Sequence, residues 1–175
     1  MNDSEPYGFA IFPKISIGSI SYEIVDLAAD QTVFEITKEG LMRPIFFMEN
    51  NEGRTVMTAK KISAWSGIYR MFKDEVRHAT LDYSISCCSS QTEIQVGTKR
   101  YLGSRLKGYC FEFVDLQGKL AFYFQRYTRL LNAEYLVEVY DNIEPEVAIM
   151  ASVILDIIIR GQQSVVTAAG ASAVT

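Results

Sequence analysis

The stretch "EPEVAIMASVILDIIIRG", residues 144–161, is the most apolar part of the chain, and its nature decides the fold. A membrane-spanning helix needs roughly 20 apolar residues to cross about 30 Å of hydrocarbon. The apolar run here covers residues 147–159, which makes about 20 Å of helix at ~1.5 Å per residue. Asp156 lies inside the run, where an aspartate at the bilayer centre costs about 2.5 kcal/mol or more. The sequence therefore predicts a buried helix and no transmembrane span.

The residues at both edges of this run are typical of helix ends. Glu144, Pro145 and Glu146 suit a first turn, because acidic residues and proline are favoured there. Arg160 suits a last turn, and Gly161 follows it. These signals predict a helix from residue 144 to residue 160.

Apolar side chains occupy most of the circumference of this helix, which is typical of a helix surrounded by protein. One row differs, because polar or small residues recur at every fourth position: Glu144, Ala148, Ser152, Asp156 and Arg160. Asp156 has two interpretations, an ion pair with Arg160 and hydrogen bonds to surrounding strands. The sequence predicts a helix enclosed by strands, with one polar row.

Before residue 141 the chain consists of short runs of β-branched and aromatic residues separated by turn signals. A strand period of two is clear in "KLAFYFQRY", residues 119–127, and in "EYLVEVY", residues 134–140. We predict strands near residues 20–26, 31–37, 43–49, 54–61, 67–72, 76–86, 92–98, 107–115, 118–127 and 134–140. Such a series predicts a barrel or a sandwich. A helix of about 17 residues (~25 Å) is long enough to thread a barrel whose strands span ~23 Å.

The length of 175 residues and the hydrophobic content of 49% fit one domain with a sizeable core. We expect a lead-in segment over residues 1–18, a barrel with its helix over residues 19–162, and a flexible tail of small residues over 163–175. Within the lead-in, "FAIFPKISI", residues 9–17, is either an edge strand or a packed segment.

The net charge and the cysteine content limit the kinds of ligand and the cell compartment to be expected for the protein. The formal net charge of −4 disfavours general nucleic-acid binding, which needs a strong positive field. The three cysteines are Cys87, Cys88 and Cys110, and an odd number with two adjacent does not make a disulfide framework. The first residues lack the basic region and apolar run of a signal peptide. A cytoplasmic protein is therefore expected.

The sequence contains no common catalytic or nucleotide-binding motif: GxSxG, HExxH, the P-loop and GxGxxG are all absent. His78 is the only histidine, which excludes multi-histidine metal sites and leaves a single general base open. The cysteines are either buried structural residues or a thiol or lipid-bearing site. Trp65, the only tryptophan, is either an interface contact or a core anchor. We expect no enzyme, no cofactor and no metal.

Three stretches in order resemble the tubby C-terminal-like superfamily, which includes tubby domains, the LURP-one-related proteins of plants and the phospholipid scramblases. They are "NNEGRTVMTAKKISAWSGIYRMF" (residues 50–72), "FEFVDLQGKLAFYFQRY" (residues 111–127) and "EYLVEVYDNIEPEVAIMASVILDIII" (residues 134–159). The resemblance covers residues 20–162 and implies a closed antiparallel β-barrel of about twelve strands enclosing a hydrophobic C-terminal α-helix. With only four prolines and one adjacent cysteine pair, the chain looks closer to the LURP-one-like branch than to a scramblase.

The resemblance implies a non-catalytic binding module that recognises a protein partner or an anionic phospholipid headgroup, such as a phosphoinositide, at a membrane surface. The alternative is a scramblase-like membrane protein. In tubby domains a basic run in a similar context binds phosphatidylinositol bisphosphate, which points to Lys60 and Lys61 here. A second candidate headgroup site is the cluster Lys99, Arg100, Arg105 and Lys107. Clustered cations bind phosphate groups well. The other interpretation is that Lys60 and Lys61 are a solvated strand end and that the second cluster is a charged loop.

Overall fold

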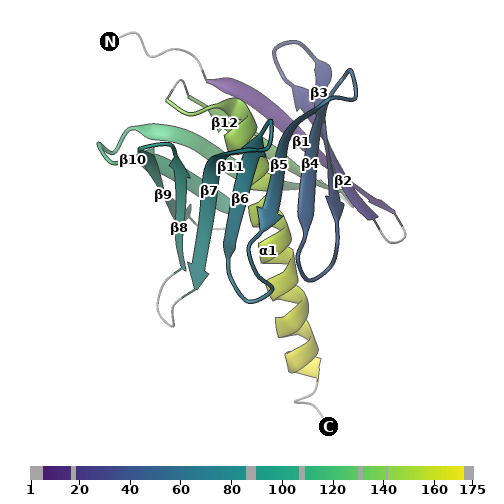
Figure 1. Cartoon of the computed structure of the whole chain (residues 1–175). Coiled ribbons are helices and arrows are strands. Elements are labelled where there is room, and N and C mark those ends of the chain that lie inside the picture. Colours follow the sequence, from purple (N-terminus) through teal and green to yellow (C-terminus); the bar gives the residue numbers. More distant parts are fainter. Residues whose placement is uncertain are drawn as a thin grey trace.

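Twelve strands and one helix make up the computed structural model (Figure 1), which describes residues 6–16, 19–85, 90–106, 109–129, 132–140 and 142–171. The elements are β1 (Tyr7–Ser16), β2 (Ser19–Asp26), β3 (Gln31–Glu39), β4 (Ile45–Asn50), β5 (Thr55–Lys61), β6 (Ile68–Lys73), β7 (Val76–Ile85), β8 (Ser90–Val96), β9 (Lys99–Leu106), β10 (Cys110–Asp115), β11 (Leu120–Arg129), β12 (Asn132–Val139) and α1 (Pro145–Ala171).

The strands form a closed antiparallel barrel in which each strand pairs with its neighbours in sequence. Closure depends on β1, which pairs with β2 on one side and with β12 on the other. Ile11 illustrates this position, because it lies opposite Ile24 of β2 and opposite Tyr135 of β12. The predicted fold class is confirmed, and the segment at residues 9–17, as far as it is described, belongs to a paired barrel strand.

The sequence pattern predicts ten strands, and the two additional strands in the structure are β1 and β9. β9 has a weak apolar signal because Tyr101 is its one buried large side chain, and Gly103 lies where another would stand. A Cβ on Gly103 would lie 2.5 Å from the ring of Phe113. That ring stacks on Phe122 with 4.3 Å between the centroids. A glycine required by the packing therefore concealed the strand.

The N-terminal part of helix α1, as far as about Ile159, lies inside the barrel and fills it, and the rest of the helix projects from the barrel (Figure 1). Ile149 and Val153 are buried and Ile157 is partly buried, as the prediction of an enclosed helix requires. Burying side chains of this size stabilises the fold by roughly 1.5–3 kcal/mol each. The barrel and its helix thus share one hydrophobic core.

The polar row on α1 meets polar groups of the barrel. Asp156 is 3% exposed and forms an ion pair with Arg160 at 2.8 Å. Its carboxylate also accepts hydrogen bonds from the hydroxyl groups of Tyr22, at 3.1 Å, and Tyr135. Burial, and then the charge of Asp156, raises the pKa of both tyrosines, so both hydroxyls stay protonated and donate. Both interpretations of Asp156 are therefore confirmed.

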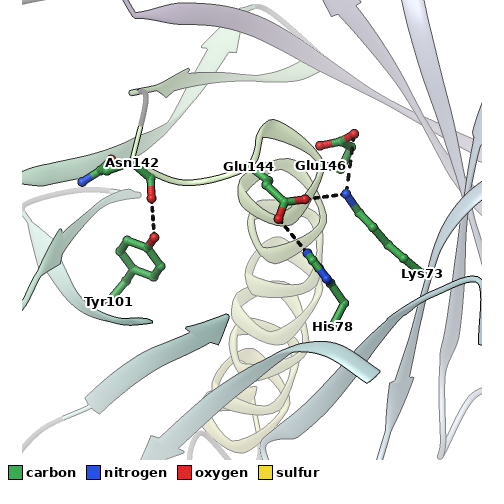
Figure 2. Close-up of polar contacts among 6 residues, drawn as sticks. All are labelled: Lys73, His78, Tyr101, Asn142, Glu144 and Glu146. Atoms are coloured by element: carbon green, nitrogen blue, oxygen red, sulfur yellow. Dashed lines mark hydrogen bonds and ion pairs between the residues drawn. The ribbon is translucent and has the colours of Figure 1, made fainter. Parts of the chain in front are cut away.

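The first turn of α1 is held to the barrel by a cluster of charges, shown in Figure 2. Lys73 Nζ lies 2.5 Å from one carboxylate oxygen of Glu144, and His78 Nε2 lies 2.9 Å from the other. Partial burial by itself raises the pKa of Glu144, but Lys73 and His78 outweigh it and hold this pKa below its ordinary value of 4.5.

This lowered pKa predicts an acid-dependent loss of stability. A carboxyl with a depressed folded-state pKa stabilises the fold above its unfolded pKa, and this contribution is lost as the pH falls through the folded pKa. We expect the Tm of the wild type to fall faster than that of Glu144→Gln below about pH 4.5. Thermal unfolding of both proteins between about pH 6 and pH 3 checks this. Parallel Tm curves would show that Glu144 gains nothing from its partners.

Helix α1 does not end before Gly161 as predicted but continues to Ala171, through most of the expected flexible tail. Gly161 has no positive φ, so it does not form the left-handed cap that its position suggested. Several of the following residues are good or acceptable helix formers, alanine above all, and no proline interrupts them. No helix in the described ranges is both long and apolar enough to cross a membrane.

Candidate functional site

Two neighbouring loops lie at the barrel end where α1 leaves the barrel (Figure 1). Residues 40–44 connect β3 to β4, and residues 62–67 connect β5 to β6. In an antiparallel barrel, alternate connections lie at the same end, which brings these two together. The backbone N–H of Lys61 donates to the carbonyl of Pro44 at 3.2 Å, so the loops start side by side. We call residues 40–44 and 62–67 the apolar loop pair.

The apolar loop pair exposes large hydrophobic side chains. Trp65 is 94% exposed, Leu41 is 90% exposed and Met42 is 66% exposed. Single exposed apolar residues are normal on a protein surface, but a group of them at one place marks an interaction site. Of the two interpretations of Trp65, this placement supports an interface contact and contradicts a core anchor.

The loop that carries Trp65 is fixed by its own hydrogen bonds. The backbone N–H of Ser66 donates to Ser63 Oγ at 3.1 Å, and the N–H of Ser63 donates to Ser66 Oγ at 3.3 Å. Lys61 Nζ donates to the carbonyl of Ala64 at 3.1 Å. These bonds hold the tip in one conformation, with the indole outside. The hydrogen bonds of the loop therefore support the conformation in which Trp65 is exposed.

Basic side chains surround the apolar loop pair. Arg43 is exposed within it, and Lys60 is exposed on the adjoining end of β5. Lys60 lies opposite Arg70 of β6 in the strand register, and its ammonium lies 5.6 Å from the centre of the Phe72 ring. In the described part of the chain, no ion pair involves Arg43, Lys60 or Arg70. Three cations that form no ion pair with the described residues therefore flank the exposed apolar tips.

The predicted headgroup residues do not form the clusters that their sequence positions suggested. Lys60 and Lys61 are adjacent, but Lys60 points outward whereas Lys61 is partly buried at the mouth of the barrel. Lys99 and Arg105 lie six residues apart on β9, about 20 Å along a strand. Arg100 is paired with Glu93 at 2.7 Å. Lys107 lies outside the described residues.

Leu41, Met42 and Arg43 are not among the site residues expected from the sequence. The available signal was "GLMRP", residues 40–44, in which two large apolar residues stand between glycine and proline, the usual residues of a turn. A turn tends to lie at the surface, and Leu41 and Met42 are indeed exposed in this one. The predicted strand at residues 43–49 includes Arg43, whereas β4 begins at Ile45.

His78 and Cys110, which the sequence offered as a general base and as a thiol, lie where their contacts suit a structural role. His78 contacts Glu144 rather than a nucleophile. Cys110 is buried and free, whereas Cys87 and Cys88 lie outside the described residues. Within the described ranges, no group of three or more His, Cys, Asp or Glu side chains is arranged to hold a metal ion.

Comparison with known proteins supports the fold. No protein-family model and no curated protein matches the chain. A solved X-ray structure of a protein from Arabidopsis thaliana superimposes with a TM-score of 0.61 over 89% of this chain and 94% of that chain. The sequences are 16% identical, so this chain is similar to the Arabidopsis protein in its fold: a closed twelve-stranded antiparallel barrel with a C-terminal helix.

Proposed function

We propose that this protein is a non-catalytic binding module that docks on anionic phospholipid surfaces through the apolar loop pair. The observation that carries the proposal is the exposure of Trp65, Leu41 and Met42 at one barrel end, beside Arg43 and Lys60. Tryptophan and large aliphatic side chains partition into the boundary between headgroups and acyl chains. Lysine and arginine next to them are attracted to anionic headgroups. The combination suits a membrane surface better than either feature alone.

The distribution of charge supports one orientation on the membrane. Turns at the opposite end of the same strands carry acidic side chains: Glu52 between β4 and β5, and Asp74 and Glu75 between β6 and β7. A negative surface potential repels these carboxylates and attracts Arg43 and Lys60 beside the apolar loop pair. Arg54, Arg77 and Lys99 offset part of the repulsion at the acidic end. The barrel would therefore face the membrane with the apolar loop pair, at the end from which α1 projects (Figure 1).

The fold and the three sequence stretches support membership of the tubby C-terminal-like superfamily, in its LURP-one-like branch. The closed barrel of twelve strands and the helix inside it have the arrangement that this resemblance implies. Membership would place the protein in the cytoplasm, peripheral to membranes. The basic residues used for docking would be Lys60, Arg43 and Arg70 rather than a run of lysines.

Tryptophan fluorescence tests the proposal directly, because Trp65 is the only tryptophan in the chain. With vesicles of phosphatidylcholine and about 30% phosphatidylserine, we expect a blue shift of its emission and flotation of the protein with the vesicles. The shift should be smaller with pure phosphatidylcholine and should weaken with added salt. The double variant Leu41→Ser/Met42→Ser should bind at least about tenfold more weakly.

A matched control is available at the opposite end of the barrel, where Leu27 is 50% exposed and Leu116 is 59% exposed. Leu27→Ser/Leu116→Ser should bind like the wild type. Absence of flotation and of any blue shift would overturn membrane docking and leave a protein partner as the occupant of the apolar loop pair. Salt-insensitive binding to neutral vesicles would favour the scramblase-like alternative.

A further inference from the structure

The barrel end where α1 begins contains a cavity of about 750 Å³, far from the apolar loop pair. This volume lies within the range of roughly 300–1,000 Å³ typical of small-molecule sites. Four separate parts of the chain line it: the start of β1, the start of β7, the β8–β9 turn and the segment between β12 and α1. Its polar lining includes Arg77, His78, Lys99, Asn142 and Glu144, several of which are seen in Figure 2.

The side-chain amide of Asn142 is the first sign that the cavity receives a ligand. Both its nitrogen and its oxygen are shielded from solvent, and neither has a hydrogen-bond partner. The residue itself is held in place, because its backbone carbonyl accepts a hydrogen bond from the Tyr101 hydroxyl. A buried amide without partners is destabilising and is rare in native proteins. Because water does not reach these two atoms, a ligand in the cavity would supply the missing partners once the Asn142 side chain turns toward it.

The charges around the cavity favour an anion. Both carboxylate oxygens of Glu144 are occupied, one by Lys73 at 2.5 Å and the other by His78 at 2.9 Å. Lys73 also lies 3.8 Å from Glu146, so these contacts offset part of the charge of Glu144. Arg77 and Lys99 lie at the rim, and neither takes part in an ion pair within the described residues; Arg77 donates to Thr80 Oγ1 at 2.9 Å. Two cations thus remain to bind a negative group.

The remaining walls are aromatic and aliphatic, and include Tyr7, Tyr140, Val96, Ile143 and Pro145. We propose that the cavity binds a small organic anion, in which a carboxylate or phosphate group is attached to a compact apolar body. The anionic group would lie against Arg77 and Lys99, the apolar body against the tyrosine rings, and a polar atom against Asn142. Inorganic phosphate would use the cations and leave the apolar walls unoccupied.

The single histidine of the chain reports on this cavity. In a one-dimensional proton spectrum, His78 contributes the only imidazole signals, so a titration needs no assignment. We expect saturable shifts of these signals with benzoate, with phenyl phosphate or with both, at millimolar concentration. Benzyl alcohol has the same ring without the charge and should bind at least about fivefold more weakly. Whichever anion binds more tightly identifies the carboxylate or the phosphate ester as the natural head group.

Variants test the assigned contacts. Arg77→Ala and Lys99→Ala should each weaken binding about fivefold, and Asn142→Asp, which adds a negative charge inside the cavity, should abolish it. Arg100→Ala is the matched control, because Arg100 is adjacent to Lys99 but pairs with Glu93 outside the cavity. Unchanged circular dichroism would show that each variant folds.

Three outcomes would overturn the proposal: no saturable shift with either aromatic anion, equally tight binding of benzyl alcohol, or full binding by both Arg77→Ala and Lys99→Ala. Inorganic phosphate that binds as tightly as phenyl phosphate would overturn the role of the apolar walls. Trp65, at the other end of the barrel, should not change its emission during these titrations. The cavity and the membrane surface are therefore tested by separate signals.

Discussion

Replacing Asp156 with alanine is expected to lower the free energy of unfolding by about 3–5 kcal/mol. The substitution removes the buried partner of Arg160, whose side chain is 26% exposed, and leaves an uncompensated cation beside the core. It also removes the acceptor for the hydroxyls of Tyr22 and Tyr135, which have little water around them. For a chain of this length, the Tm should fall by roughly 10 °C or more.

Urea unfolding followed by circular dichroism measures this loss, with the slope m checked for constancy so that the change can be assigned to stability. The control is Arg100→Ala, which breaks an ion pair on the exposed outside of the barrel and should leave the midpoint unchanged. An Asp156→Ala midpoint close to that of the wild type would show that the polar row of α1 adds nothing to the fold.

The second large effect is expected at Gly67, immediately before β6. A Cβ on this residue would lie 1.8 Å from the carbonyl oxygen of Tyr83, in the neighbouring strand β7. The contact atom belongs to the backbone, and the Tyr83 N–H donates to the Gly67 carbonyl at 3.1 Å, so neither segment can move without breaking the pairing. Gly67→Ala should therefore destabilise the protein by about 3 kcal/mol or more.

Gly161 provides a control, because the same change from glycine to alanine should there alter the free energy of unfolding in the opposite direction. It lies within α1 with nothing near its missing Cβ, and its φ is not positive. Gly161→Ala should raise the free energy of unfolding by about 0.5–1 kcal/mol, because alanine loses less backbone entropy in a helix. Chemical unfolding of the two variants side by side decides this prediction. Equal effects at both positions would contradict the close approach at Gly67.

Local patterns in the sequence were sufficient to predict the helix and most of the strands. Asp156 and Arg160 lie four residues apart in an apolar run, and this spacing made their ion pair one of two predicted roles for Asp156. The pattern fails where a neighbouring side chain takes the place of the residue's own: the Phe113 ring occupies the space beside Gly103, and β9 therefore lacks the alternation of a strand. At Gly161 the pattern predicts a helix end that does not occur, because glycine permits a helix end without requiring one.

The candidate sites were much less predictable than the fold. Lys60 and Lys61 are neighbours in sequence, but strand geometry sends adjacent side chains to opposite faces. Lys60 instead joins Arg70, which is distant in sequence and becomes its neighbour through strand register. Asn142 gives no signal at all in the sequence, since its unpaired amide depends on four parts of the chain closing around it.

The order of the elements has a consequence for synthesis on the ribosome. All twelve strands leave the exit tunnel before α1. β1 cannot pair with its second neighbour, β12, until β12 has been synthesised. Until then the nascent chain presents an empty apolar interior and two unpaired strand edges, a combination that favours aggregation. Contacts between such distant segments also form slowly. Chaperones that hold the nascent strands apart should therefore influence the yield of this protein more than they influence helical proteins of the same size.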